Sequence, residues 1–300
     1  MTAPLPGTAL GRWRGAVTTW LAAVVKTARP RQWPKNLLVL AAPIAGASLG
    51  RDDGAAYALV AVVAFTAASC SVYFVNDVLD AGRDRQHPKK RLRPVASGAL
   101  PASQALALAA LAAGEWIGEP LLTLTIAAYL VISFAYSLAL KHLPVVELAC
   151  VASGFVLRAL GGAAATHVPP SGWFLTVCSL GALVVAVSKR RGELAVLGPA
   201  AAQHRPVMRW YRFGALSALA RVLAAAMVVS YALWAVGDGD GWAQAWHLVS
   251  VVPLAVALVR FDWLAGQGTG KPVEDLLARD RPMAVAELAW LALFALGLSS

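Results

Sequence analysis

The stretch AVVAFTAASCSVYFVNDVLDAGRDRQHPKKRLRP, from Ala61 to Pro94, decides how this chain folds. Its first half is almost purely apolar, which is typical of a helix that crosses a membrane. Its second half places three aspartates and a dense run of Lys and Arg directly at the end of that helix. We therefore expect a membrane protein whose functional groups lie at the rim of the bilayer.

The composition of the whole chain indicates the same class. Of its 300 residues, 59% are hydrophobic and 14% are charged, and the mean hydropathy is +0.63. A soluble domain would carry roughly 25% charged residues, so this chain has too little polar surface to cover itself in water. Its 25 glycines suit transmembrane helices whose backbones approach closely.

Apolar windows predict an all-α integral membrane protein with nine transmembrane helices, in a single domain over residues 1–300. The predicted spans are 36–50, 55–79, 101–118, 120–140, 143–165, 172–188, 213–236, 242–261 and 282–299. Residues 12–35 mix Trp, aliphatic residues and cations. We expect residues 1–35 to form an N-terminal interfacial amphipathic segment on an anionic leaflet.

The charges of the loops alternate sharply along the chain. If the N-terminus is cytoplasmic, 23 of the 26 Lys and Arg residues fall in cytoplasmic segments, and the external loops are acidic or neutral. We expect a multi-pass plasma-membrane protein whose N-terminus and active-site loops are cytoplasmic and whose C-terminus is external. The same rule explains much of the net charge of +10, so basic residues alone do not identify a site.

Asp77, Asp80 and Asp84 are spaced i, i+3, i+7, so on a helix they fall within about 60° of arc. Three carboxylates on one face at a membrane boundary repel each other and require a cation. Oxygen ligands of this kind suit Mg²⁺, whose coordination is commonly completed by substrate phosphates. Asn76 can orient the first carboxylate or add an oxygen. The alternative is a set of solvated carboxylates paired with neighbouring cations, namely Arg83, Arg85 and Lys89.

The basic run that follows the aspartates has two interpretations. Lys89, Arg91 and Arg93 can bind phosphate oxygens, with Arg offering a bidentate fork. They can equally be cytoplasmic charge that sets the topology. For His87, a loop or capping role is favoured over catalysis.

NDVLDAGRDRQHPKKRLRPVASG, residues 76–98, resembles the first signature of the UbiA-type superfamily of intramembrane prenyltransferases, NDxxDxxxD followed by a basic stretch and RP-[IVL]-A-x-G. Members of that family hold a diphosphate through Mg²⁺ in a nine-helix bundle with a lipid-facing opening. The resemblance therefore implies a UbiA-like bundle and Mg²⁺ as cofactor.

The second aspartate motif of the family is altered here. Its loop begins SKRRGEL, and Lys189, Arg190 and Glu193 stand where the family carries acids. A site with fewer acids and more cations suits substrates that carry more phosphate charge. With RPRQWPKNLLVLAAP (29–43), YSLALKH (136–142) and EDLLARDRP (274–282), this loop is similar to one branch of the family, found in mycobacteria and related actinobacteria.

That branch transfers a 5-phosphoribosyl group from phosphoribosyl pyrophosphate (PRPP) to decaprenyl phosphate. The reaction releases pyrophosphate and gives decaprenylphosphoryl-5-phosphoribose, the first committed step to the arabinose donor of cell-wall arabinan. The resemblance implies PRPP, decaprenyl phosphate and the lipid bilayer as partners. It also suggests a homo-oligomer, a trimer in relatives.

The resemblance and the residues together predict a set of roles. The catalytic and metal-binding residues are expected to be Asp77, Asp80 and Asp84. The expected substrate-binding residues are Lys35, Asn36, Asn76, Lys89, Arg91, Arg93, Tyr136, Lys141, Arg158, Lys189, Arg190 and Glu193. The sequence leaves the role of Arg158 undecided, because this residue can instead make an interhelical bond. Glu274, Asp275 and Asp280 can gate the site or pair with Arg279 and Arg281.

Two alternatives remain at this point. One is a UbiA-type enzyme that transfers a prenyl diphosphate to an aromatic acceptor, which the altered second motif disfavours. The other is a membrane transporter of phosphorylated solutes, with Arg158 and the acids along its path. Nucleic-acid binding is disfavoured because the basic residues follow the predicted membrane topology.

Overall fold

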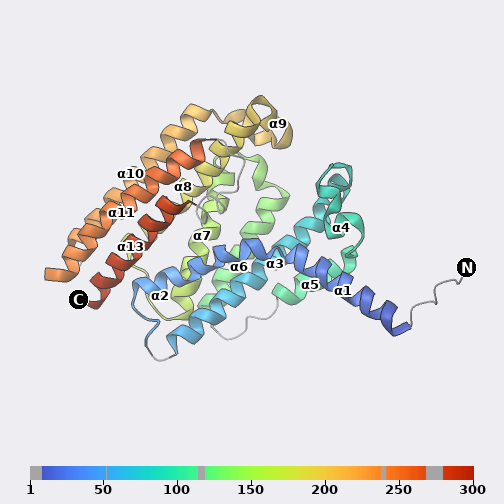
Figure 1. The fold of residues 1–300 in the computed structure, drawn as a ribbon, viewed down its shortest axis with the longest axis horizontal. Coiled ribbons are helices and arrows are strands. Elements are labelled where there is room, and N and C mark those ends of the chain that lie inside the picture. Colours follow the sequence, from blue (N-terminus) through green and yellow to red (C-terminus); the bar gives the residue numbers. More distant parts are fainter. Residues whose placement is uncertain (1–8, 52, 114–118, 238–240, 268–279) are drawn as a thin grey trace, which may run out of the picture.

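The computed structural model of the protein describes residues 9–51, 53–113, 119–237, 241–267 and 280–300, and within them every regular element is a helix (Figure 1). Seven of these helices are long and apolar enough to cross a membrane. They are α3 (Gly54–Gln86), α6 (Pro120–Leu138), α7 (Val146–Ala165), α8 (Gly172–Leu197), α10 (Phe213–Gly237), α11 (Gly241–Gly266) and α13 (Arg281–Ser299).

Shorter elements lie between and before these seven helices. The first part of the chain forms α1 (Ala9–Ala28), the 3₁₀ helix η1 (Pro30–Leu40) and α2 (Ala41–Ala45). The connection from α3 to α6 contains η2 (Lys90–Leu92), α4 (Pro94–Ser97) and α5 (Ala102–Ala113). The remaining short elements are η3 (Leu140–His142), η4 (Gly198–Ala200), α9 (Ala201–His204) and η5 (Pro206–Trp210).

The helices form two groups that α7 joins. On one side α8, α10, α11 and α13 pack together, and on the other α3 packs against α1, α5 and η1 (Figure 1). Helix α7 contacts α6 and α8 as well as α3 and η1. The central position of α7 therefore fixes how the two groups face each other.

Small residues on α7 permit these contacts. A Cβ atom on Gly162 would lie 1.7 Å from the carbonyl oxygen of Val39 in η1, and one on Gly161 would lie 2.1 Å from the ring of Phe65 in α3. Close approach through small residues is what helix packing in a bilayer favours. The glycine-rich composition is thus used where α7 meets η1 and α3.

The number of candidate spans differs from the predicted nine. The predicted span 36–50 is not one long α-helix, because η1 contains Pro34 and continues only as the five residues of α2. The predicted span 101–118 is represented by the 12 residues of α5, and residues 114–118 lie outside the described ranges. The described residues thus hold seven candidate spans and two shorter segments at the other two positions.

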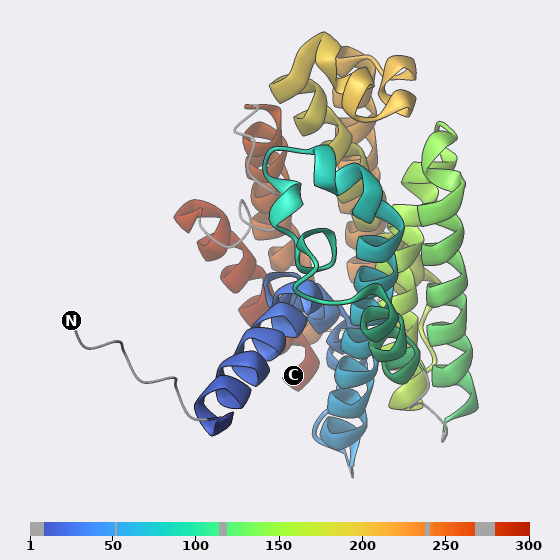
Figure 2. The ribbon, with the colours of Figure 1, turned by 90° about the vertical axis from the view of Figure 1, so that its right-hand side faces the viewer.

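Helix α3 is the element that carries the acidic motif beyond the membrane. Its 33 residues make a helix of about 50 Å, against roughly 30 Å for the hydrocarbon core of a bilayer. The last turns, which hold the aspartates, therefore project past the apolar layer. The segments α4 and α9 lie toward the same end of the bundle (Figure 2).

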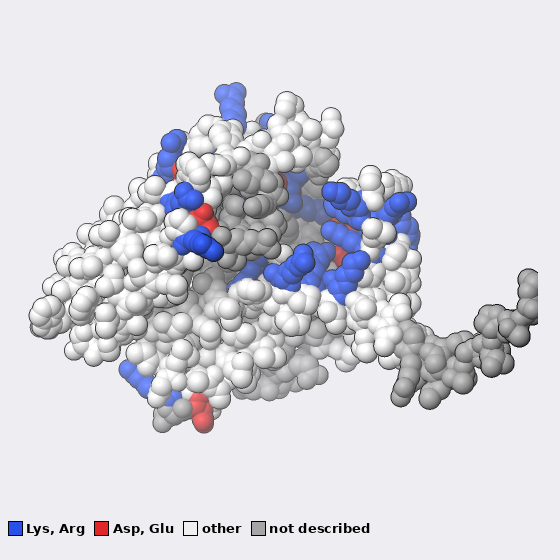
Figure 3. Space-filling view, viewed as in Figure 1, with Lys and Arg blue, Asp and Glu red and all other residues white. Residues whose placement is uncertain are grey.

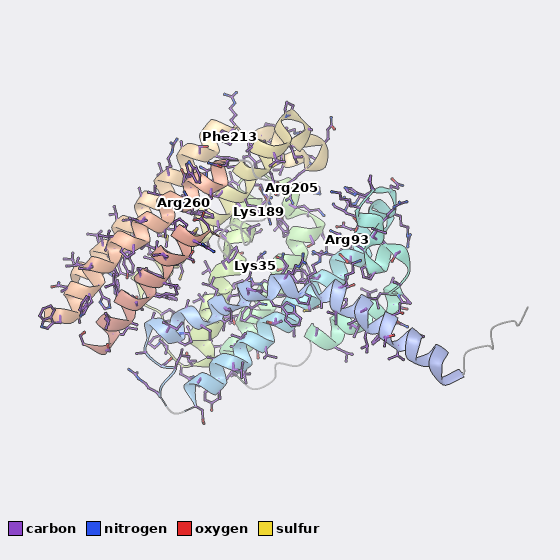
Figure 4. All side chains as sticks on the ribbon, viewed as in Figure 1. Lys35, Arg93, Lys189, Arg205, Phe213 and Arg260 are labelled. Atoms are coloured by element: carbon purple, nitrogen blue, oxygen red, sulfur yellow. The ribbon has the colours of Figure 1, made fainter. Side chains whose placement is uncertain are left out.

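Lys and Arg side chains gather at this end of the molecule, on both sides of a hollow between the α4 and α9 regions (Figure 3). Lys35, Arg93, Lys189 and Arg205, which come from four different segments, surround it (Figure 4). We call the space between these four residues the central hollow. The sequence elements that place them there are η1, the residue before α4, α8 and the residue between α9 and η5.

Candidate functional site

The acidic motif of α3 forms one wall of the site. Asp77 is 2% exposed, and its Oδ1 accepts a hydrogen bond of 2.5 Å from Nη2 of Arg29. Asp84 accepts one of 2.7 Å from Nη1 of Arg93, and the same nitrogen lies 3.5 Å from Oδ1 of Asp77. Arg93 thus bridges two buried carboxylates that are seven residues apart on α3.

Asp80, on the same side of α3, pairs with a different arginine. It is paired with Arg83 at 2.5 Å, and its side chain is 35% exposed. It lines a cavity of about 240 Å³ between α3 and the α6–η3 connection, together with Asn76 and Lys141. The helical arithmetic that placed the three aspartates within 60° is correct, but the surrounding cations divide them into two environments.

Within the described residues, no group of three or more Asp, Glu, His or Cys side chains is close enough to hold a metal ion. The donor chemistry nevertheless fits Mg²⁺, because carboxylate and amide oxygens are the hard ligands that this ion prefers. Arg93 already places positive charge between Asp77 and Asp84. These two carboxylates, together with Asp80 and Asn76, are the residues suited to a divalent cation.

The basic loop after α3 is ordered by His87. Its Nδ1 accepts hydrogen bonds of 3.2 Å from the backbone amides of Lys89 and Lys90, which is the capping role predicted for it. Lys89 and Arg91 are exposed to solvent, whereas Arg93 is half-buried against the aspartates. Lys89 and Arg91 are therefore accessible to an anion from solution.

The opposite wall contains a buried ionic cluster. Arg190 of α8 is 1% exposed and binds both carboxylate oxygens of Glu147 of α7, with Nε–Oε1 at 2.7 Å and Nη2–Oε2 at 2.5 Å. Its Nη1 donates to Glu193 at 2.6 Å. Burial beside Glu147 also raises the pKa of the Tyr211 phenol. Arg190 and Glu193, predicted to bind substrate, are thus bound to each other.

Two further side chains complete this cluster. The hydroxyl of Tyr136 accepts a hydrogen bond of 3.2 Å from Nη2 of Arg190 and one of 2.8 Å from Nη1 of Arg205. Arg205 lies between α9 and η5, so the cluster ties this short region to α6, α7 and α8. We call Glu147, Arg190, Glu193, Arg205 and Tyr136 the second-motif cluster.

Arg158 makes the interhelical contacts that the sequence left open. Its Nε donates to Oδ1 of Asn36 at 2.7 Å, and its Nη2 donates to Ser69 at 2.9 Å and to Tyr129 at 3.2 Å. Asn36 is 1% exposed and also donates to Thr66. Both residues are therefore engaged inside the bundle and hold η1 against α3 and α7.

Lys35 directly precedes Asn36 and borders the central hollow, as does Lys189 (Figure 4). Lys35 is half-buried and Lys189 is exposed. Since Asn36 is anchored by Arg158, the backbone that carries Lys35 is held in place. The structure therefore brings Lys35, Lys189 and Arg93 to one space.

The acids of the last connection do not form a group in the described residues. Glu274 and Asp275 lie outside the described ranges, as does Arg279. Asp280 caps α13 by accepting from the amide of Met283, and it receives two hydrogen bonds from Arg260 of α11. Its partner is therefore Arg260, where Arg279 or Arg281 was expected.

Arg29 and Arg205 are members of the site that the sequence did not predict, because the loop charge pattern does not distinguish either from other cytoplasmic charge. Arg29 carries one visible signal, since it directly precedes Pro30, and the structure gives it a left-handed backbone with φ of 53°. No local pattern marks Arg205, because its contact with Tyr136 joins residues 69 positions apart.

The all-helical bundle with an acidic end on α3 is the arrangement expected of a UbiA-type intramembrane protein. The UbiA prenyltransferase family matches residues 36–271, and the chain belongs to this family. A solved UbiA homologue from Archaeoglobus fulgidus, bound to GPP and Mg²⁺, has the same fold, with a TM-score of 0.61 over 92% of this chain and 98% of the other. The two sequences are 15% identical.

Within the family, the chain is similar to one particular kind of protein. It is 38% identical to the decaprenyl-phosphate phosphoribosyltransferase of Mycobacterium tuberculosis over 281 residues, which cover 91% of this chain and 93% of the relative. The protein of the same name from Corynebacterium glutamicum is 33% identical over 89% of this chain and 84% of its own length.

Proposed function

We propose that this protein transfers the 5-phosphoribosyl group of PRPP to decaprenyl phosphate and releases pyrophosphate. Relatives with this activity in their names match about nine-tenths of the chain. The observation that carries the proposal is the central hollow, where cations from four segments surround a space beside the carboxylates of α3 (Figure 4). Such a site suits two substrates that both carry phosphate.

The location of the site matches substrates of unlike solubility. A polyprenyl phosphate keeps its tail in the bilayer and its ionised head at the interface, because burying a phosphate charge in hydrocarbon is costly. PRPP enters from water. The aspartates stand at the end of α3 that projects beyond the apolar layer, so both substrates can reach them.

Mg²⁺ would be held by Asp77, Asp80 and Asp84, with Asn76 as a further oxygen donor. When bound, Mg²⁺ supplies positive charge that stabilises pyrophosphate as a leaving group. Arg93 would then be released from the two carboxylates to contact phosphate. We assign the remaining phosphate charge to Lys35 and Lys189 beside the hollow, to Lys141 beside Asp80, and to the exposed Lys89 and Arg91.

Buried members of the predicted set have a supporting role in this proposal. Arg158 and Asn36 hold the segment that carries Lys35. Arg190 is enclosed by Glu147 and Glu193 and supports Tyr136 from behind. Preorganised donors are effective because they need no rearrangement when charge develops in the transition state.

The chemistry requires little proton transfer. The bond from C1 of the ribose to the pyrophosphate oxygen breaks with oxocarbenium character, and a phosphate oxygen of the lipid attacks C1. That oxygen is already anionic near neutral pH, so no strong general base is needed. Attack from the face opposite the pyrophosphate inverts the configuration at C1.

We also propose the predicted topology of nine crossings with a cytoplasmic site. The first crossing would run through the predicted span 36–50, which contains the second half of η1 and all of α2. Lys35 would then stand at the cytoplasmic end of this crossing. The crossing near α5 would include residues 114–118.

Mass spectrometry tests the activity. Purified protein is incubated with labelled PRPP, decaprenyl phosphate and Mg²⁺, and the lipid product is identified. We expect decaprenylphosphoryl-5-phosphoribose and an equal amount of pyrophosphate. A product formed only from a prenyl diphosphate and an aromatic acceptor would instead assign the protein to the aromatic branch of the family.

Asp80→Asn tests the metal-binding assignment. Because Asp80 is partly exposed, its replacement is expected to leave the fold intact while pyrophosphate release falls by at least about 100-fold. Asp77→Asn should have the same effect, and removal of Mg²⁺ with EDTA should abolish release by the native protein. Asp53→Asn, at the other end of α3, is the matched control and should retain activity. Full activity of Asp80→Asn and Asp77→Asn would contradict the assignment.

A further inference from the structure

The two arginines of the second-motif cluster differ in how far their charge is neutralised. Arg190 is 1% exposed and forms hydrogen bonds with Glu147, Glu193 and Tyr136. Arg205 is 32% exposed, and its approaches to carboxylates are long, 3.7 Å to Glu147 and 3.8 Å to Glu193. Both distances exceed the range of a good hydrogen bond. The glutamates therefore orient Arg205 but leave some of its N–H groups without a close carboxylate acceptor.

Tyr136 supplies the second observation. Its oxygen accepts from Arg190 at 3.2 Å and from Arg205 at 2.8 Å. A hydroxyl group has one proton besides its acceptor lone pairs, so while Tyr136 accepts from both arginines its proton is available to a third group. In the described part of the chain, this hydroxyl makes no hydrogen bond as a donor.

Tyr136 and Arg205 together offer hydrogen-bond donors at the edge of the central hollow. The Tyr136 proton and the unsaturated N–H groups of Arg205 belong to neighbouring atoms, since the two side chains are bonded to each other. Figure 4 places Arg205 at the edge of the central hollow, which Lys189 and Arg93 also border. An acceptor with several oxygens in the hollow can receive both kinds of donor at once.

We propose that Arg205 and Tyr136 form a subsite for a phosphate monoester, opposite the wall that carries the aspartates. The inference rests on the proposed function, which supplies two sources of this group: the 5-phosphate of PRPP and the head group of decaprenyl phosphate. A phosphate monoester matches because its oxygens can take the planar fork of Arg205 and the Tyr136 proton together. Glu147 and Arg190 position Tyr136 from the buried side.

The experiment compares Arg205→Gln with Arg209→Gln. Arg209 lies in η5, is exposed and stacks on Trp210, so its replacement removes the same charge from the same region without touching Tyr136. KM is measured separately for PRPP and for decaprenyl phosphate. We expect Arg205→Gln to raise KM for one of them by roughly 10- to 100-fold, the loss expected for hydrogen bonds to a charged group. Arg209→Gln should leave both values unchanged.

The substrate whose KM rises identifies the source of the phosphate. A rise for PRPP assigns the subsite to its 5-phosphate, and ribose 5-phosphate should then inhibit the native enzyme more strongly than Arg205→Gln. A rise for the lipid assigns it to the acceptor. Unchanged KM values for both substrates, with or without a lower kcat, would overturn the proposal.

Two further variants separate binding from folding. Tyr136→Phe removes the donated proton and should raise the same KM as Arg205→Gln. Arg205→Lys keeps the charge but loses the fork, and it should give an intermediate KM. Melting temperatures in detergent identify variants that fail to fold.

The subsite can also be tested separately from the proposed function. If the native protein forms no product from PRPP, the proposed function fails. The native protein and Arg205→Gln are then titrated with ribose 5-phosphate and with inorganic phosphate, which measures the subsite directly. Equal binding of these ligands by the two proteins would overturn it.

Discussion

Glu147 shows how strongly one side chain can be committed to its surroundings. It is fully buried and receives three hydrogen bonds from Arg190. Removing one partner of a buried ion pair leaves the other charge without compensation, and this costs more than the pair itself contributes. A substitution of Glu147 therefore tests whether the second-motif cluster stabilises the contact between α7 and α8.

We predict that Glu147→Gln lowers the free energy of unfolding by about 3 kcal/mol, because Arg190 would remain buried beside a neutral amide. Thermal unfolding of the purified protein in detergent measures this effect. Glu193→Gln is the matched control: Glu193 is 30% exposed, so the loss should stay below about 1 kcal/mol. Equal losses in the two variants would contradict the dominant role of Glu147.

At the scale of single residues, the sequence identified chemical types better than partners. The helical spacing of Asp77 and Asp84 correctly places them on one side of α3, where both contact Arg93. It could not show that Arg29, 48 positions earlier, pairs with Asp77. The same holds for Arg190: its charge suggested a phosphate ligand, and only the fold shows Glu147 beside it.

At the scale of elements, α13 provides a pH-dependent contact. Asp280 caps this helix and accepts two hydrogen bonds from Arg260, which hold the pKa of its carboxyl below the usual value. A group whose pKa is lowered in the folded state stabilises it above the pKa of the unfolded state, about 3.9. This contribution is lost as the pH falls through the lower, folded value.

We predict that the melting temperature of the native protein falls below about pH 4 partly through this carboxyl. Asp280→Asn retains a capping oxygen but cannot titrate, so the acid-induced part of the decrease should become smaller. Melting curves of the two proteins between neutral and acidic pH measure the difference. Identical pH profiles would show that Asp280 makes no titrating contribution.

The elements themselves were predicted unevenly. The long apolar runs predicted the starts of seven helices within three residues, because uniform hydropathy over a bilayer's thickness is a strong signal. The ends of α3 and α8 were predicted too early, at 79 and 188, since their last turns are polar but the helices continue to Gln86 and Leu197. Helix α11 also continues past the predicted end, from 261 to Gly266. For residues 36–50, hydropathy alone could not reveal a 3₁₀ segment that begins with Pro30 and contains Pro34.

At the scale of the whole molecule, the topology can be tested with single cysteines. We predict that Arg51→Cys reacts with a membrane-impermeant maleimide on intact cells, because the loop before α3 is expected to be external. Arg91→Cys, in the loop after α3, should react only after the cells are permeabilised. Both variants are made in a background without Cys70, Cys150 and Cys178. Labelling of Arg91→Cys from outside would reverse the proposed orientation.

The arrangement of the two helix groups lay beyond the sequence. Loop charges predict which ends of the helices lie together, and they correctly bring the basic segments near α4 and α9 to the same end (Figures 2 and 3). They contain no information on which helices touch. That α7 stands between the groups depends on Gly161 and Gly162, whose role becomes visible only beside Phe65 and Val39.

The contacts of Arg158 bear on how the chain is made. An arginine at the middle of an inserting helix costs roughly 2.5–3.5 kcal/mol on insertion scales. Asn36, Ser69 and Tyr129, which receive its hydrogen bonds from other elements, all precede it in the chain. When α7 leaves the ribosome, these acceptors have already been synthesised, so the guanidinium can form hydrogen bonds with them as soon as α7 enters the lipid. The order of translation thus lowers the cost of inserting Arg158, whose hydrogen bonds later join α7 to η1, α3 and α6.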